Sequence, residues 1–115
     1  MRIKAQIWIN AYIRRLGAEC IPAVVTRKGD ADAGAIFIKV ATLDGRALIL
    51  RPAIAGLDGA AADRSWSLAF NGESVEESKA DDFLARQAEF DCDMWIIEIE
   101  DRAGRHGLDE ALMPE

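Results

Sequence analysis

The clearest pattern of apolar and polar positions lies between residues 35 and 51, and it predicts a β-hairpin. Two apolar runs, residues 35–41 and 46–51, flank the pair Asp44-Gly45. Asp-Gly between apolar runs is a strong signal for a two-residue type I′ turn, because both central residues of that turn need positive φ. This turn sets the pairing across the hairpin, with Leu43 opposite Arg46, Ala41 opposite Leu48 and Val40 opposite Ile49.

Two other segments have the periodicity of amphipathic helices. Residues 4–16 carry one apolar stripe, and Gly17 is expected just beyond the end of this helix. Residues 75–89 follow Ser74-x-x-Glu77, the pattern of a capping box at a helix start. The predicted stripes are Ala5, Trp8, Ile9, Tyr12, Ile13 and Leu16 in the first helix, and Val75, Lys79 or Ala80, Phe83, Leu84 and Ala88 in the second.

Three further segments have the composition or alternation of strands. Residues 21–27 are rich in β-branched side chains and contain Pro22, which lacks a backbone donor and therefore suits a strand end or a sheet edge. The other two strands are residues 65–70 and 94–100, the loops are 28–34 and 52–63, and residues 101–115 form a polar C-terminal tail. This order predicts a single α+β domain over residues 1–115, with an antiparallel sheet of about five strands and two helices packed on one face.

The predicted layers leave apolar surface uncovered. Both sides of the hairpin are apolar in the expected register, and two helices about 10 Å across cover one face of a sheet about 24 Å wide. Because such a patch usually marks an interface, we expect a homo-oligomer or a protein partner. The interface candidates are Phe37, Leu48, Leu50, Ile3 and Ile7. In the alternative, Leu108, Leu112 and Met113 fold the tail back over this face.

The composition is that of a globular domain with an excess of acid. The chain has 115 residues, 50% of them hydrophobic, and its 14 Lys and Arg against 20 Asp and Glu give a formal net charge of −6. This charge repels phosphate backbones and anionic lipid, so we expect no nucleic-acid and no membrane partner. The sequence shows no signal-like segment, and its two cysteines are Cys20 and Cys92. These features predict a cytoplasmic protein with free thiols.

Two spacings resemble ligand sites but lack essential residues. Gly29 and Gly34 have phosphate-loop spacing, yet Ala35-Ile36 stand where Lys and Ser or Thr are required. Asp30 and Asp32 match the first and third positions of a calcium loop, but the Glu needed at its twelfth position is missing. We therefore interpret these residues as parts of a turn, and we predict neither a metal nor a cofactor.

The candidates for acid–base chemistry are few. Glu98 and Glu100 share a strand face about 6.5–7 Å apart, a separation that suits acid–base catalysis and equally suits a charged sheet edge. His106 is the single histidine and lies in the polar tail, where we expect it to be exposed and dispensable. No GxSxG, HExxH or GxGxxG motif occurs in the sequence. The pattern favours a protein without catalysis.

Several stretches together resemble a small bacterial family, mainly alphaproteobacterial, that is described only as a domain of unknown function. The most specific stretch is Phe90-Asp91-Cys92-Asp93-Met94-Trp95-Ile96-Ile97-Glu98-Ile99-Glu100-Asp101-Arg102. The others are Arg14-Arg15-Leu16, Arg27-Lys28-Gly29-Asp30 with Ala33-Gly34-Ala35 and Lys39-Val40 beyond it, and Phe83-Leu84-Ala85-Arg86-Gln87. The resemblance covers nearly the whole chain and implies a stand-alone cytosolic domain of this length. It implies no activity, ligand or catalytic residue, and the Pro of the family at the position of Cys92 implies that this thiol is not functional.

We therefore predict a non-catalytic module that binds another protein or a second copy of itself. The alternative is a small-molecule-binding protein or an enzyme with a site near the loop 28–34. Its candidate polar contacts are Arg27, Asp30, Asp32 and Arg51, and its candidate acid–base groups are Glu98, Glu100 and His106. A thermal-shift panel of metabolites separates the two hypotheses, because a ligand that binds the folded state stabilises it.

Overall fold

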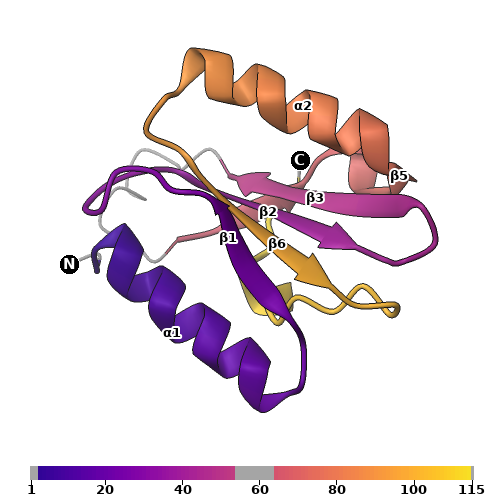
Figure 1. The fold of residues 1–115 in the computed structure, drawn as a ribbon, viewed down its shortest axis with the longest axis horizontal. Coiled ribbons are helices and arrows are strands. Elements are labelled where there is room, and N and C mark those ends of the chain that lie inside the picture. The colour runs from indigo at the N-terminus through magenta and orange to yellow at the C-terminus, as the bar shows by residue number, and fades with distance from the viewer. Residues whose placement is uncertain (1–2, 54–63, 115) are drawn as a thin grey trace.

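The computed structural model describes residues 3–53 and 64–114, which form a six-stranded sheet between two helices (Figure 1). The predicted α+β class is confirmed. The elements are α1 (Ala5–Ala18), β1 (Ala23–Arg27), β2 (Ile36–Ala41), β3 (Arg46–Pro52), β4 (Trp66–Leu68), η2 (Phe70–Gly72), β5 (Val75–Glu76), α2 (Glu77–Phe90), β6 (Trp95–Glu100) and η3 (Asp109–Ala111). The loop predicted for residues 52–63 lies outside the described residues from residue 54 onward, and Pro52 belongs to β3.

The sheet has the order β1-β6-β2-β3-β4, and the short β5 pairs with β3. Neighbouring strands are antiparallel except β2 and β6, which run parallel at the centre of the sheet. The prediction of about five antiparallel strands therefore missed β5 and the parallel pair. β1 forms one edge, as Pro22 indicated, and a bulge between Val25 and Arg27 interrupts its pairing with β6.

The hairpin of β2 and β3 is present, but its predicted register is wrong by one residue. The observed pairs are Ile38 with Leu50, Lys39 with Ile49, Val40 with Leu48 and Ala41 with Ala47. Side chains alternate between the two faces along a strand, so a shift of one residue moves every β3 side chain to the other face. Leu48 and Leu50 therefore share a face with Ile38 and not, as predicted, with Phe37.

The connecting loop has three residues instead of two. Positive φ angles occur at Leu43 (64°) and Gly45 (84°), whereas the prediction placed them at Asp44 and Gly45. The Asp44 carboxylate accepts hydrogen bonds from the Thr42 hydroxyl at 2.6 Å and from the Arg46 amide at 3.1 Å. Asp44, which indicated a two-residue turn, thus stabilises the three-residue loop through its side chain.

The helices pack on opposite faces of the sheet, so the prediction that both lie on one face is wrong (Figure 1). The α1 face buries Ile9, Tyr12, Leu16, Ile38, Val40, Leu50, Trp66, Ile97 and Ile99. The α2 face buries Phe37, Ala47, Ile49, Ala80, Leu84 and Met94. Both faces of the central strands are apolar because a helix of the same chain packs on each face, and not because a partner protein covers one of them.

This arrangement changes the meaning of the five interface candidates. Phe37 is 7% exposed and Leu50 is 0% exposed, and they belong to different cores of the same chain. Leu48 is half-buried against the α1 core. Of the five candidates, Ile3 and Ile7 lie at the surface and are 51% and 57% exposed.

The predicted stripe of α1 is confirmed, since its members are buried or partly buried in the α1 core. The helix ends two residues later than predicted, and Cys20, with φ of 61°, takes the left-handed position that was predicted for Gly17. The Cys20 amide donates to the Gly17 carbonyl at 3.0 Å, and the Ile21 amide donates to the Leu16 carbonyl at 2.9 Å. These two bonds, with Ile21 and Leu16 in the same core, form a Schellman motif.

The predicted capping box at α2 is absent. Glu76 occupies the N-cap position and makes no capping bond with its side chain, and Ser74 lies before β5. The Ser74 hydroxyl accepts a bond from Arg46 Nε at 3.0 Å, and the Glu77 carboxylate accepts one from Lys39 Nζ at 2.8 Å. Both side chains of the motif therefore hold the hairpin to the start of α2 instead of capping the helix.

The C-terminal segment is folded onto the α1 face over residues 101–114. Leu108 is 6% exposed within the α1 core, and Leu112 packs against this core. His106 is also 6% exposed, so the prediction that it is exposed is wrong. Its Nδ1 accepts a bond from the Leu108 amide at 3.0 Å, and its carbonyl accepts one from the Tyr12 hydroxyl at 2.6 Å. The alternative in which the tail folds back on the sheet therefore holds for Leu108 and Leu112, but on the face that α1 also covers, and Met113 is 52% exposed.

The loop 28–34 packs tightly against the turn before β6, and this contact needs glycine. A Cβ atom on Gly29 would lie 2.1 Å from the Asp93 carbonyl oxygen, and one on Gly34 would lie 2.3 Å from it. Lack of space beside the Asp93 carbonyl therefore excludes a side chain at both positions of the turn. Asp30 locks the contact, because its amide donates to Asp93 O at 2.9 Å and its carbonyl accepts from Trp95 Nε1 at 2.7 Å.

Candidate functional site

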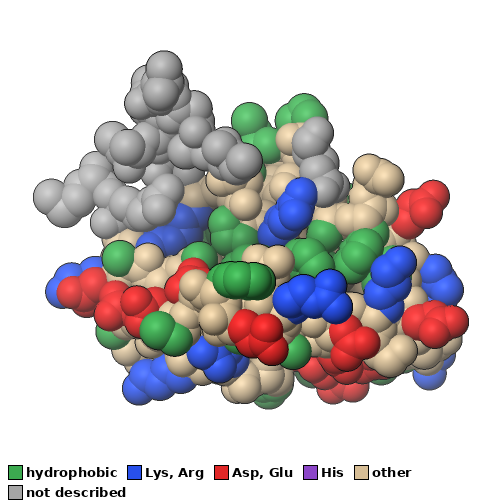
Figure 2. All heavy atoms as spheres, turned by 90° about the horizontal axis from the view of Figure 1, so that it is seen from above, with side chains coloured by type: hydrophobic (Ala, Val, Ile, Leu, Met, Phe, Trp, Pro, Cys, Tyr) green, Lys and Arg blue, Asp and Glu red, His purple; other side chains and the backbone are tan. Residues whose placement is uncertain are grey.

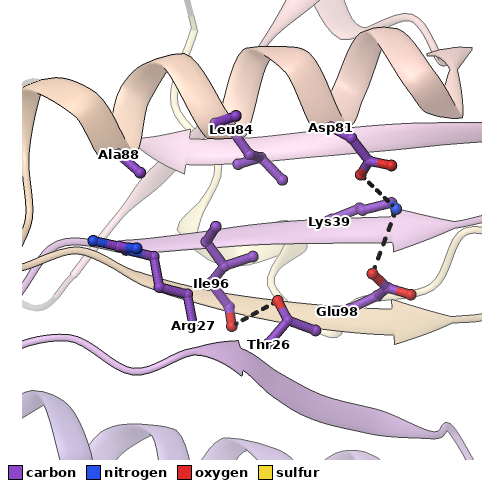
Figure 3. Close-up of a pocket in the computed structure, with 9 residues that line it drawn as sticks. Thr26, Arg27, Lys39, Asp81, Leu84, Ala88, Ile96 and Glu98 are labelled. Atoms are coloured by element: carbon purple, nitrogen blue, oxygen red, sulfur yellow. Dashed lines mark hydrogen bonds and ion pairs between the residues drawn. The ribbon is translucent and has the colours of Figure 1, made fainter.

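A groove opens on the α2 face of the sheet, between α2 and the edge formed by β6 and β1 (Figure 3). α2 packs over β2 and β3 and forms one wall. The groove has a volume of about 340 Å³. Its lining residues are Thr26 and Arg27 of β1, Lys39 of β2, Ile96 and Glu98 of β6, and Asp81, Leu84, Ala85 and Ala88 of α2.

A buried ammonium group surrounded by carboxylates marks one end of the groove. Lys39 lies at the centre of the sheet, and its side chain is 4% exposed. Its Nζ donates to Glu77 Oε2 and to Asp81 Oδ1, each at 2.8 Å, and lies 3.4 Å from Glu98 Oε1. Figure 3 shows Lys39 between Asp81 and Glu98. Three carboxylates around one ammonium leave a net charge of −2 at this end.

These neighbours fix the protonation state of Lys39. Burial alone would lower the pKa of its ammonium group, but hydrogen bonds to Asp81 and Glu77 and the charge of Glu98 outweigh burial and raise this pKa. Lys39 is therefore protonated at neutral pH. A lysine that acts as a general base needs a lowered pKa, so this arrangement suits charge pairing and not proton transfer.

The opposite end of the groove is cationic. Arg27 ends β1, and its Nη2 donates to the Cys92 carbonyl at 3.2 Å. Its Nε is buried and has no acceptor among the described residues. The exposed Lys28 follows directly. Figure 3 shows Arg27 near Ala88, at the far end of the groove from Lys39.

The middle of the groove is apolar. Asp81, Leu84, Ala85 and Ala88 follow the helical spacing that places side chains on one face of α2, and Ile96 lies beneath them on β6. Leu84 is 4% exposed, and Ile96 is half-buried. Seen from above, this side of the molecule shows hydrophobic side chains among acidic and basic ones (Figure 2). The groove thus runs from an acidic end, across an apolar middle, to a cationic end.

The structure brings together two of the six residues that were predicted to contact a ligand, Arg27 and Glu98. The sequence interpretation missed Lys39 and its partner Asp81. A usable signal was present, since Lys39 is the one charge inside the apolar run of β2 and a buried lysine requires acidic partners. The spacing of Glu77 and Asp81 on one face of α2 offered those partners.

The other four predicted contacts lie outside the groove. Asp30 and Asp32 lie in the loop 28–34 between β1 and β2, which packs against the start of α1. The Asp30 carboxylate accepts a hydrogen bond from the Asp32 amide at 3.1 Å, so Asp30 acts as the turn acid that we predicted. Arg51 lies on β3 and pairs with Ser67 of β4, two strands away from β6. Glu100 is exposed at the end of β6.

In residues 3–53 and 64–114, no group of three or more His, Cys, Asp or Glu side chains could hold a metal ion. Cys20 and Cys92 are exposed free thiols. Neither helix within these ranges is long and apolar enough to cross a bilayer.

Comparisons with known proteins place the chain in a family. The model of the family described as "Protein of unknown function (DUF1491)" matches residues 3–109. The chain is similar to a DUF1491 family protein from Caulobacter crescentus CB15 in a crystal structure, with 36% identity, a TM-score of 0.80, and coverage of 98% of this chain and 99% of that one. An NMR structure of a DUF1491 family protein from the same organism gives 38% identity, a TM-score of 0.80 and 98% coverage of each chain.

A solution structure of a protein from A. tumefaciens matches with 35% identity and a TM-score of 0.75, covering 87% of this chain and 86% of that one. No curated protein matches the chain. The resemblance that the sequence indicated, to an alphaproteobacterial family of unknown function, is confirmed. The match over residues 3–109 and the near-complete coverage of both Caulobacter structures show that the chain belongs to the DUF1491 family.

Proposed function

We propose that this protein is a non-catalytic module that binds another protein, and that the groove beside α2 is its docking surface. The observation that supports this most strongly is the open strip over β6 and β1, which has an apolar middle between an acidic and a cationic end. Protein interfaces combine an apolar centre with a polar rim in the same way. The groove is therefore organised as a surface that recognises a partner by shape and by charge.

The titratable groups of the molecule support binding over catalysis. Lys39 is held in its charged form by its three carboxylates. His106 belongs to the segment that packs on the α1 face, on the other side of the sheet from the groove. Glu100 is exposed at a strand end, and its spacing from Glu98 is that of alternate residues on a charged strand.

The proposal can be tested by comparing two matched helix variants. Ala85→Arg places a long cation in the groove, and Ala11→Arg makes the same change on α1, on the opposite face of the sheet. Both alanines are exposed, so both variants should unfold at nearly the temperature of the original protein. Each protein is immobilised, exposed to an extract of the bacterium that encodes it, and the retained proteins are identified by mass spectrometry.

We expect at least one protein to be retained by the original chain and by Ala11→Arg, and lost by Ala85→Arg. Retention of the same proteins by all three chains would contradict a docking role for the groove. If the retained protein is a second copy of this chain, light scattering at increasing concentration will show it directly, and the module is then self-associating.

A second candidate, the binding of a small anionic molecule, is supported by Arg27. Its buried Nε has no acceptor within residues 3–53 and 64–114, and a carboxylate or phosphate group accepts strong hydrogen bonds from guanidinium. This end of the groove adjoins the loop 28–34, where the sequence predicted a ligand site. In a thermal-shift panel, a ligand at about 100 times its Kd should add about 2.7 kcal/mol to the stability. Arg27→Met should abolish that gain, and an equal gain in the variant would place the ligand elsewhere.

A further inference from the structure

The open part of the α2 face has the dimensions of one helix. Neighbouring strands lie about 4.8 Å apart, so β6 and β1 together offer about 10 Å of floor, which is the diameter of a helix. The wall of α2 from Asp81 to Ala88 is about 10 Å long, or two helical turns. A helix in this space would pack beside α2 at the usual interhelical distance of about 8–10 Å.

An added strand at the free edge of β1 fits the structure less well. Pro22 lacks an amide hydrogen just before β1, and the bulge between Val25 and Arg27 interrupts this edge. Both features protect edge strands from pairing with other chains. Val24 is 59% exposed and lies opposite Glu98, so it extends the floor of the groove. The apolar surface available to a partner is therefore the face of the sheet and not its edge.

The acidic end of the groove retains capacity for a second cation. The side chains of Glu77, Asp81 and Glu98 are 42%, 57% and 32% exposed, although all three contact Lys39. Each carboxylate has more acceptor sites than its contact with Lys39 uses. Glu100 lies on the same face of β6, two residues beyond Glu98, and adds a further negative charge. A basic side chain of a partner would find several acceptors here.

We propose that the groove binds an α-helix of another protein, with an apolar stripe over about two turns and a Lys or Arg that faces Asp81 and Glu98. The inference rests on the proposed function, since it assumes that the groove is a docking surface. The apolar stripe covers Leu84, Ala88 and Ile96, and the basic side chain lies among the exposed carboxylates. An acidic or amide side chain at the other end of the stripe faces Arg27.

An unbiased probe for this helix is a library of peptides displayed on a fixed helical scaffold, with the residues of one face randomised over three turns. The library is selected on the original protein and, in parallel, on Ala85→Arg. A second library of extended peptides of the same length is selected in the same way. We expect only helical peptides to be enriched, with apolar residues at i, i+3 or i+4, and i+7 and a Lys or Arg at one end of this stripe. Ala85→Arg should not enrich them.

The charge of the acidic end is tested with an enriched peptide. Glu98→Gln keeps a hydrogen-bond acceptor for Lys39 and removes one charge, and should weaken binding about two- to fivefold, as expected for one partly exposed ion pair. The matched change Glu89→Gln, at an exposed position near the end of α2 that does not line the groove, should leave the affinity unchanged. An equal effect of both variants would contradict the proposed contact.

The remaining outcomes separate the two proposals. Enrichment of extended peptides, of helices without a basic residue, or of no peptide at all would overturn the proposed helix. The docking role of the groove would survive each of these results if Ala85→Arg still loses the protein retained from the bacterial extract. If no basic helical peptide is enriched and Ala85→Arg retains the same proteins as the original chain, both proposals are overturned.

Discussion

The imidazole of His106 holds the C-terminal segment, and this makes stability depend on pH below neutrality. Burial lowers the pKa of His106, whose Nδ1 accepts the Leu108 amide and therefore carries no proton. The nearby Asp109 carboxylate opposes this shift without cancelling it. Above a pH of about 6.5, the ordinary pKa of histidine, the imidazole is neutral in both the folded and the unfolded chain, so its burial costs no stability. As the pH falls below that value the unfolded chain takes up the proton first, so the folded state loses stability until the pH reaches the folded pKa.

We predict that the free energy of unfolding falls between pH 7.5 and pH 5.5, by up to about 1.4 kcal/mol per pH unit below 6.5. Urea unfolding at both pH values measures this. His106→Asn keeps an acceptor that can reach the amide two residues ahead, but it does not titrate in this range. In this variant the unfolding free energies at pH 7.5 and pH 5.5 should therefore differ much less than in the original protein. An unchanged difference would assign the effect to another group.

Lys39 is the second buried group whose removal should have a large effect. Lys39→Met fills the same space but leaves Glu77, Asp81 and Glu98 close together without their shared cation. We expect the unfolding free energy at pH 7 to fall by about 1.5–3 kcal/mol, the range for hydrogen bonds to charged groups. The exposed Lys28→Met is the control, and an equal loss in both variants would contradict this account.

The sequence interpretation assigned no partners to His106 and Lys39, because those partners are distant along the chain. The Tyr12 hydroxyl that binds the His106 carbonyl is 94 residues away, and Asp81 is 42 residues from Lys39. Local context predicted an exposed histidine in a polar tail, and for Lys39 it offered one signal, a single charge inside the apolar run of β2. Arg27 and Glu98 were found because strand ends and alternation are local properties, and the groove that joins them is not.

Among the elements, the β2–β3 hairpin shows how a correct prediction of an element can carry a wrong register. Asp44-Gly45 marks the position of the turn, but the same pair fits both a two-residue turn and a three-residue loop. The two choices differ by one residue in the register of the strands. The difference is decided by the side chain of Asp44, which holds Thr42 and Arg46 across the longer loop. The one-residue shift exchanged the two faces of β3, so Leu48 and Leu50 lie on the α1 face with Ile38.

The three-residue loop predicts a stabilising substitution that the two-residue turn does not. Leu43 has a φ of 64° and is 46% exposed, so it has a strained backbone and little burial in return. Leu43→Asn should raise the unfolding free energy by about 0.5–1 kcal/mol, because asparagine tolerates the left-handed region. Chemical denaturation measures the change. Gly45→Val, at a φ of 84° in the same loop, should lower stability by about 1–2 kcal/mol. A destabilising Leu43→Asn would argue for the shorter turn.

For the whole molecule, the expectation of a homo-oligomer came from counting layers. Two helices on one face of the sheet would have left the other face bare, and the sequence offers no regular element to cover it. The structure places one helix on each face and folds residues 101–114 beside α1, so the apolar surface is covered within one chain. Among the described residues, the apolar surface that stays open is limited to the groove and to scattered exposed side chains such as Ile3, Ile7 and Phe90.

We therefore predict that the 115-residue chain is a monomer at tens of micromolar in light scattering, and that the C-terminal segment keeps it monomeric. Removal of residues 105–115 deletes Leu108 and Leu112 from the α1 core and removes the acceptor of Tyr12. The uncovered apolar face should then cause self-association or loss of cooperative unfolding, whereas removal of residues 114–115 should change neither. A dimer of the 115-residue chain that Ile7→Glu converts into a monomer would contradict the prediction. Such a result would show that the exposed side of α1, with Ile3 and Ile7, is an interface. A new charge at residue 7 prevents association only if this side chain is buried between two copies of the chain.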